Sequence, residues 1–441
     1  MKINELHTPS RRFLRSTQLE RDFSDPGALE GYILTPEIEL CVSRLARGLA
    51  PNSGQRAWRI TGDYGSGKSS FALLFANLIA RENSALPKHL RHLQREFVPS
   101  NARQKLLPVL VTGSREPIAI VLLRALNSVL SREIDGRISL QSQHSIQAAL
   151  RASDRLSDDR VVELVDAAAR ELHARNLYRG IFIVLDELGK FLEFAALNPE
   201  RQDVFFLQRL GEISARSGDS CLFTVSLLHQ GFGAYADKLS EAAQREWEKI
   251  AGRFEEFVFS QPLAQTATLV AAALELKEAP VLRGWKPKAQ SDMGKAVELG
   301  LFGPEAHKTG LLNIAAELYP LHATVLPVLS KFFRRFGQNE RSLFSFLLSS
   351  EPYALQSFAV QEASPETVYR LHHFYDFAAQ SFGHRLSTQS FRSHWNHIDG
   401  VIRSYFGSSY APTRVASYAN RVGKDPYGDE RDMPVPSIPI R

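Results

Sequence analysis

Apolar and polar positions alternate in two distinct rhythms over the first 260 residues of the chain. Five segments have the length of strands: 57–61, 106–111, 181–185, 222–228 and 254–260, and the run 181–185 is apolar throughout. Runs that are apolar throughout are typical of parallel sheets covered on both faces. Segments with apolar residues at helical spacing lie beside and between them: 36–50, 69–80, 117–130, 161–175, 200–216 and 236–250. This alternation predicts an α/β fold, a three-layer sandwich around a mostly parallel five-stranded sheet.

Beyond residue 261 the strand-like runs stop and helical spacing takes over. Helices are expected at four segments: 262–277, 306–318, 323–336 and 340–348. We interpret 262–350 as a helical lid domain, with a loop at 286–290 around Pro287. Residues 351–406 are expected to form a further C-terminal helical region, in which aromatic residues at helical spacing predict a small core of its own. The polar stretch 132–160 shows no pattern typical of a core.

The two ends of the chain differ from the segments between them. Residues 1–35 are polar and arginine-rich, and we expect a polar arm that precedes an α/β domain at 36–261. Residues 407–441 are rich in proline, glycine and charge. Such a composition buries too little apolar surface to offset the entropy of ordering, so we expect this tail to be disordered.

Composition defines the broad class of the protein. The chain has 441 residues, 44% of them hydrophobic, which is enough for sizeable cores in more than one domain. It shows neither an apolar run of about 18 residues for a membrane span nor a secretory signal. Its two cysteines, Cys41 and Cys221, lack metal-ligand spacing and fit a reducing compartment. We therefore expect a cytoplasmic protein without a membrane partner.

The net charge of +5 permits nucleic-acid binding without requiring it. Two small basic clusters are candidates for a DNA contact: Arg11, Arg12 and Arg15, and Lys331, Arg334 and Arg335. Charge clusters are more often solvated faces, so DNA is one open alternative for a partner.

The segment 62–70 carries the strongest chemical signal, because it contains the complete pattern G-x-x-x-x-G-K-[ST] between a predicted strand and a predicted helix. Its residues are Gly62, Asp63, Tyr64, Gly65, Ser66, Gly67, Lys68, Ser69 and Ser70. The glycines allow successive N–H groups to cradle phosphate oxygens, and the positive end of the helix faces the same anion. Lys68 would reach the β- and γ-phosphates, and Ser69 would bind Mg²⁺. The segment predicts a P-loop site for ATP and Mg²⁺.

Asp186 and Glu187 directly follow the apolar run 181–185. Open α/β sheets place ligands at the carboxyl ends of their strands, so this pair is expected beside the phosphate loop. Asp186 would hold Mg²⁺, and Glu187 would orient and polarise the water that attacks the γ-phosphate. The alternative, a strand followed by an ordinary helix start, is the minority interpretation beside an intact phosphate loop. The glutamate favours an ATPase over a module that only binds ATP.

One extra strand and helix, 106–130, separate Lys68 from Asp186, and a glutamate directly follows the aspartate. In both respects the chain resembles ATP hydrolysers with an additional strand. It looks like a member of the AAA+ superfamily, in its origin-recognition-like branch, or of the related signalling ATPases called STAND. The resemblance implies a P-loop ATPase domain that oligomerises or joins other subunits.

The same resemblance implies roles for three further positions. Such proteins carry a polar sensor group after the fourth strand, where His229 is the match and Ser226 its rival. Between a helix and the fifth strand they carry an arginine finger for the neighbouring subunit's site. Arg253 is the candidate, and Arg245 is the weaker one. A second sensor arginine near the start of a lid helix reaches back to the γ-phosphate, and Arg341 is the match. Each of these residues has a purely structural alternative.

The segments GDYGSGKSS, VLDELGKFLEF and FGQNERSLFSFLLSSEP together resemble the large ATPases of bacterial anti-phage defence islands, including BREX-type systems. Those proteins usually continue well beyond this length, so we expect a short or truncated form, or a subunit whose effector is separate. Two functions follow from the resemblance. The first is an AAA+ ATPase that acts on DNA or in anti-phage defence. The alternative is a STAND-type switch with slow turnover that assembles or activates a partner.

Overall fold

The computed structural model describes residues 1–10, 13, 17–50, 53–95, 105–152, 156–201, 203–237, 239–260, 262–277, 280–304, 308–336, 343–388 and 392–406. Contacts divide the chain into two compact units. The sheet unit is Arg15–Pro262, and the helical unit is Met1–Leu14 together with Leu263–Arg441. Among the helices in these ranges, none has the length and apolar character needed to cross a bilayer.

The sheet unit contains a five-stranded sheet in which every pair of neighbours is parallel. The strands are β1 (Ala57–Thr61), β2 (Leu106–Thr112), β3 (Gly180–Asp186), β4 (Cys221–Leu228) and β5 (Glu255–Val258). Their order is β2-β3-β4-β1-β5, so β4 lies between the strand that precedes the phosphate loop and the strand that ends in Asp186. The predicted α/β fold with an additional strand is confirmed.

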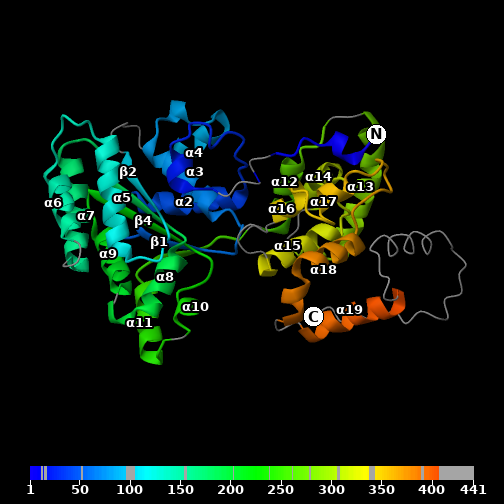
Figure 1. Cartoon of the computed structure of the whole chain (residues 1–441). Coiled ribbons are helices and arrows are strands. Elements are labelled where there is room, and N and C mark those ends of the chain that lie inside the picture. The colour runs from blue at the N-terminus through cyan, green and yellow to red at the C-terminus, as the bar shows by residue number, and fades with distance from the viewer. Residues whose placement is uncertain are drawn as a thin grey trace, which may run out of the picture. The chain divides into compact units, whose positions relative to one another are not determined.

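Helices cover both faces of this sheet, as the apolar strands require. One layer contains α1 (Leu19–Phe23), α2 (Pro36–Gly48), α3 (Lys68–Ala80) and α4 (Arg91–Arg95). The opposite layer contains α5 (Ile118–Glu133), α6 (Gln141–Arg151), α7 (Asp158–Ala174), α8 (Leu188–Leu197), α9 (Val204–Arg216), α10 (Gly233–Ala236) and α11 (Glu241–Ala251) (Figure 1). Alternate residues of β3 divide between the layers: Phe182 packs with α3, and Ile183 packs on the other side.

The stretch 132–160, which shows no core pattern in the sequence, contributes to this second layer. Leu140 and Ile146 are fully buried there, at the start of α6 and within it. The expectation of a coreless segment is therefore wrong. The helix α6 is largely polar, and its two buried residues, Ser142 and Ile146, leave little apolar periodicity to recognise.

The helical unit is built from eight α-helices within the described ranges. They are α12 (Leu263–Leu274), α13 (Pro280–Glu298), α14 (Lys308–Ile314), α15 (Val325–Phe336), α16 (Leu343–Leu348), α17 (Leu355–Phe358), α18 (Leu371–Thr388) and α19 (Arg392–Phe406). The loop expected at 286–290 is wrong, because these residues lie inside α13 and Pro287 is accommodated within the helix.

The aromatic residues of 366–406 do not form a separate core. Phe374, Phe377 and Phe382 belong to the same buried cluster as the residues of α12 and α15. The ring centroid of Phe332 on α15 lies 5.1 Å from that of Phe374 and 5.0 Å from that of Phe382. The aromatic spacing in the sequence marks a helix face but does not reveal which partner that face covers.

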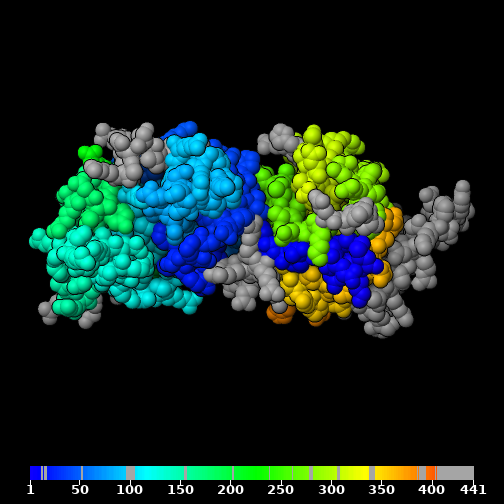
Figure 2. Space-filling view, turned by 90° about the horizontal axis from the view of Figure 1, so that it is seen from above, coloured from blue at the N-terminus to red at the C-terminus, as the bar shows by residue number. Residues whose placement is uncertain are grey.

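The first residues of the chain are part of the helical unit and not a polar arm. Ile3 and Leu6 are buried in its core. The Ile3 N–H donates to the Gln361 carbonyl at 3.0 Å, and the Asn4 N–H donates to the Ala359 carbonyl at 2.9 Å. Figure 2 shows these N-terminal residues, in dark blue, packed against the green to orange residues of the helical unit. The tail 407–441 lies outside the described residues.

Candidate nucleotide site

The phosphate loop connects β1 to α3 at the carboxyl edge of the sheet. Each of its three glycine positions has a backbone conformation or a close contact that disfavours a side chain. Gly65 and Gly67 have φ values of +71° and +95°, which side chains rarely tolerate. A Cβ atom on Gly62 would lie 2.3 Å from the Phe259 carbonyl oxygen. The Gly62 N–H donates to the Leu228 carbonyl at 3.2 Å, which joins the start of the loop to the end of β4.

Lys68 lies inside this loop with only 5% of its surface exposed. Its Nζ donates to the carbonyl oxygens of Gly62 at 2.6 Å and Asp63 at 2.8 Å. Burial lowers the pKa of Lys68 to about 8, and the carboxylates of Asp186 and Asp63 oppose that shift. The loop therefore surrounds a cation, which is the arrangement that a polyphosphate needs.

Ser69 and Asp186 bring two oxygen ligands together at the start of α3. The Ser69 hydroxyl donates to Asp186 Oδ1 at 3.1 Å. Burial raises the pKa of Asp186 to about 6, although hydrogen bonds from Ser69 and from the Glu187 N–H lower it in part. A hydroxyl beside a carboxylate is a suitable donor set for Mg²⁺, so these residues fit the ion that the sequence predicts.

Glu187 forms the N-terminal cap position of α8 with a left-handed backbone, at φ +50°. Its main chain is held closely: a Cβ on Gly113 would lie 2.2 Å from the Glu187 carbonyl oxygen. The Gly113 N–H also donates to the Asp186 carbonyl at 2.8 Å. The Glu187 carboxylate forms an ion pair with Lys190, one turn later on α8. The sequence argument overlooked Lys190, although its spacing of three residues from Glu187 was a usable signal.

His229 lies beside Lys68, and the structure distinguishes it from its rival. His229 Nδ1 is 3.3 Å from Lys68 Nζ, and the ring of Tyr64 stacks on the imidazole. Burial, followed by the charges of Lys68 and Lys190, lowers the pKa of His229 to about 3, so the ring is neutral near pH 7. The Ser226 hydroxyl is buried and has no hydrogen-bond partner among the described residues. Of these two residues, His229 is the one that contacts the side chains of the phosphate loop.

The two candidate arginine fingers each form an ion pair with a glutamate of this chain. Arg253 Nε lies 3.4 Å from a carboxylate oxygen of Glu212 on α9. Arg245 pairs with Glu241 at 3.3 Å on the exposed face of α11. Arg341 lies outside the described residues, as do Arg11, Arg12 and Arg15, whereas Lys331, Arg334 and Arg335 lie on α15.

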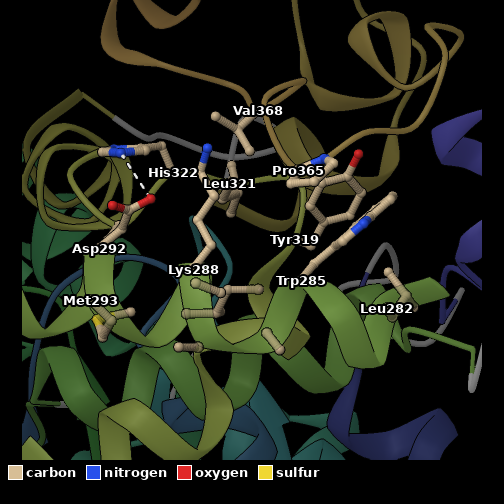
Figure 3. Close-up of a pocket in the computed structure, with 15 residues that line it drawn as sticks. Leu282, Trp285, Lys288, Asp292, Met293, Tyr319, Leu321, His322, Pro365 and Val368 are labelled. Atoms are coloured by element: carbon tan, nitrogen blue, oxygen red, sulfur yellow. Dashed lines mark ion pairs between the residues drawn. The ribbon is translucent and has the colours of Figure 1, made fainter. Parts of the chain in front are cut away.

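A small hollow lies in the helical unit, apart from the phosphate loop, with a volume of about 50 Å³. Trp285 and Tyr319 form one wall, with ring centroids 5.2 Å apart. On the other side His322 lies 3.9 Å from Asp292 (Figure 3). This volume admits only a few water molecules, so the hollow is no candidate for a nucleotide.

Comparisons with known proteins add little to this geometry. Neither a family model nor a curated protein matches the sequence. Among solved structures the chain is similar to the ORC2 protein of Aeropyrum pernix, determined in ADPNP–ADP complexes, with 12% identity and a TM-score of 0.41. The alignment covers 94% of this chain and 89% of that one. A similarity of this strength does not define a function. The chain itself has a five-stranded parallel sheet in the order β2-β3-β4-β1-β5, with a phosphate loop and an acidic pair at its carboxyl edge.

Proposed function

We propose that this protein binds ATP with Mg²⁺ and hydrolyses it, as an ATPase module of the AAA+ type. The observation that supports this best is the convergence of Lys68, Ser69 and Asp186 from two non-adjacent strands, with Ser69 hydrogen-bonded to Asp186 at 3.1 Å. Glu187 follows at the same edge. A phosphate cradle, a pair of Mg²⁺ ligands and a carboxylate for water are the parts that phosphoryl transfer requires.

In this mechanism the loop N–H groups and the N-terminus of α3 bind the phosphate oxygens. Lys68 leaves the Gly62 and Asp63 carbonyls and donates to the β- and γ-phosphates. Ser69 and Asp186 would hold Mg²⁺, and the ion would supply positive charge to neutralise the negative charge that develops during phosphoryl transfer. Glu187 orients the attacking water by accepting a hydrogen bond from it. His229 is our proposal for the residue beside the γ-phosphate.

Two substitutions in the purified full chain test the assignment. Glu187→Gln should lower ATP turnover at least about a hundredfold and leave ATP binding intact, because the phosphate cradle is unchanged. Lys68→Ala should weaken ATP binding itself, because a phosphate charge loses its counter-ion. Glu255→Gln, at an exposed position of β5, is the matched control. Unchanged turnover in Glu187→Gln would refute the role of Glu187.

A signalling switch of the STAND type is the second candidate. The observation that favours it is that both charged side chains of the site already have partners in this chain: Lys68 donates to loop carbonyls, and Glu187 pairs with Lys190. Such a switch would retain ATP tightly and turn it over slowly. Stopped-flow release of a fluorescent ATP analogue, measured beside steady-state turnover, separates the two: fast release with fast turnover contradicts the switch.

Assembly, DNA and a role in anti-phage defence are further parts of the proposal. The Arg253 side chain is 53% exposed and, among the residues that the structure describes, has a single long ion pair, so a neighbouring subunit could recruit it as an arginine finger. Turnover per chain should then rise with protein concentration, and Arg253→Ala should abolish that rise. Adding duplex DNA to the same assay tests the DNA partner. A concentration-independent rate from a chain that stays monomeric with ATP would contradict the finger.

A further inference from the structure

Tyr64 and His229 form a face-to-face pair that the proposed mechanism does not use. Their ring centroids are 3.4 Å apart and their planes differ by 20°. Tyr64 belongs to the phosphate loop and remains 43% exposed, so burial gives little reason for an aromatic ring at this position. What its ring does cover is one face of the imidazole.

The contact with Lys68 determines which nitrogen of His229 carries the proton. Nδ1 lies 3.3 Å from the Lys68 ammonium, and an ammonium group can only donate. Nδ1 must therefore accept, and the proton of the neutral ring is on Nε2. That N–H is the remaining donor of the imidazole.

The main chain of His229 has a neighbour on another side. The backbone N–H groups of His229 and Gln230 interact with the Tyr235 hydroxyl, on α10, and partly oppose the rise in its pKa that burial causes. Tyr235 itself is packed against α8, where a Cβ on Gly189 would lie 2.5 Å from its hydroxyl oxygen. Tyr235 is thus packed between α8 and the turn after β4, while Tyr64 restricts the orientation of the ring.

We propose that Tyr64 is a positioning residue, which stacks on His229 and holds the ring with its Nε2–H available to a bound γ-phosphate. The idea rests on the proposed ATPase function. Because Tyr64 lies in the loop that binds the phosphates, the stack connects occupancy of that loop to the orientation of the sensor. The ring, and not the hydroxyl, provides the contact.

Turnover of three variants tests this role. Tyr64→Ala should lower kcat by about threefold to tenfold with little change in KM, and Tyr64→Phe should restore it, because the stack needs only the ring. His229→Ala should lower kcat, and adding Tyr64→Ala to it should have no further effect. The proposal would be overturned if the double variant showed the product of the two single kcat losses. It would also be overturned if Tyr64→Phe were as impaired as Tyr64→Ala.

The pH profile is a sharper readout. The charged or titratable groups that influence His229 are Lys68 on α3, Lys190 on α8 and the Tyr64 and Tyr235 hydroxyls. Without the stacked ring, water reaches the imidazole, so Tyr64→Ala should lose turnover below about pH 6.5 as His229 becomes protonated. The Tyr64→Phe profile should match that of the parent. Superimposable profiles for Tyr64→Ala and Tyr64→Phe would contradict the role.

A measurement independent of turnover separates this proposal from the ATPase assignment. Histidine ring ¹⁵N spectra of the nucleotide-free chain should show His229, identified by its loss in His229→Ala, as a neutral Nε2–H ring down to pH 5. In Tyr64→Ala this signal should titrate at higher pH, and in Tyr64→Phe it should not. If the parent chain fails to hydrolyse ATP while these spectra behave as stated, the function is wrong and the positioning stands. An unaltered signal in Tyr64→Ala refutes the positioning.

Discussion

Lys190 and Glu187 face each other across the first turn of α8, and both side chains are partly exposed. The Lys190 ammonium stabilises the negative charge of the Glu187 carboxylate. It thereby makes this carboxylate a weaker hydrogen-bond acceptor for the water that it is proposed to orient. Lys190→Met should therefore raise ATP turnover by up to about fivefold, the scale of an exposed ion pair, without changing ATP affinity. Lys249→Met, which removes a similarly spaced pair with Glu246 on α11, is the control. A fall in turnover would show that Lys190 assists Glu187.

Gly113 is where the end of β2 touches the main chain of Glu187. Gly113→Ala places a Cβ atom 2.2 Å from the Glu187 carbonyl oxygen, and backbone cannot move as a side-chain tip does. We expect a loss of about 1–3 kcal/mol of stability and reduced turnover, because Glu187 must shift. Gly136→Ala, with open space around the position, is the control. Thermal unfolding and turnover of both variants measure the difference, and equal effects would contradict the argument.

At the scale of elements, the aromatic contacts of α15 hold the helical unit together. Phe333 has ring centroids within about 6 Å of Phe346 and Phe377. Phe333→Ala should cost about 3–5 kcal/mol, whereas Val328→Ala on the exposed side of the same helix should cost little. Denaturant unfolding of the two variants gives both numbers. A small cost at Phe333 would mean that the faces of α15 are assigned the wrong way round.

Elements whose signals are local could be predicted from the sequence. The strand before the phosphate loop, the loop and α3 are contiguous, and β3 is apolar up to its final residue, Asp186, so their types and order follow from the pattern. The helix around Pro287 was missed because a proline weakens the pattern while its neighbours still pack. The sharing of one core by α15 and α18 could not be foreseen, because periodicity identifies a face but not its partner.

The candidate site shows the same division. Lys68, Ser69 and Asp186 were predicted because their chemistry follows strand ends, which the fold brings to one edge. The stack of Tyr64 on His229 depends on how two loops meet, and the pairing of Arg253 with Glu212 depends on the contact of α11 with α9. Neither leaves a periodic trace in the sequence.

At the scale of the whole molecule, neutral histidines that are buried or half-buried make stability depend on pH. Burial lowers the pKa of His7 and His373 to about 4, and lowers those of His322 and His372 as well. The unfolded chain takes up these protons near pH 6.5. The stabilisation is therefore complete above pH 6.5 and is lost as the pH falls towards 4, by up to about 3 kcal/mol for His7.

Unfolding measurements at pH 7.5, 6 and 5 check this expectation. His7→Leu should flatten the dependence of stability on pH over this interval, because the group that gains the proton is gone. His144→Gln, at an exposed position of α6, should leave the slope unchanged. A slope that His7→Leu does not alter would assign the acid sensitivity to other groups.

The chain builds the helical unit from its first residues and from those after Pro262, with the whole sheet unit between them. During synthesis on the ribosome, Ile3 and Leu6 therefore emerge long before the helices that bury them. The sheet unit can complete its own core first, because all its strands lie in one continuous segment. Maturation of the helical unit must then wait until the residues after Pro262 have been translated, so an early stop after the sheet unit would leave Ile3 and Leu6 without the helices that bury them.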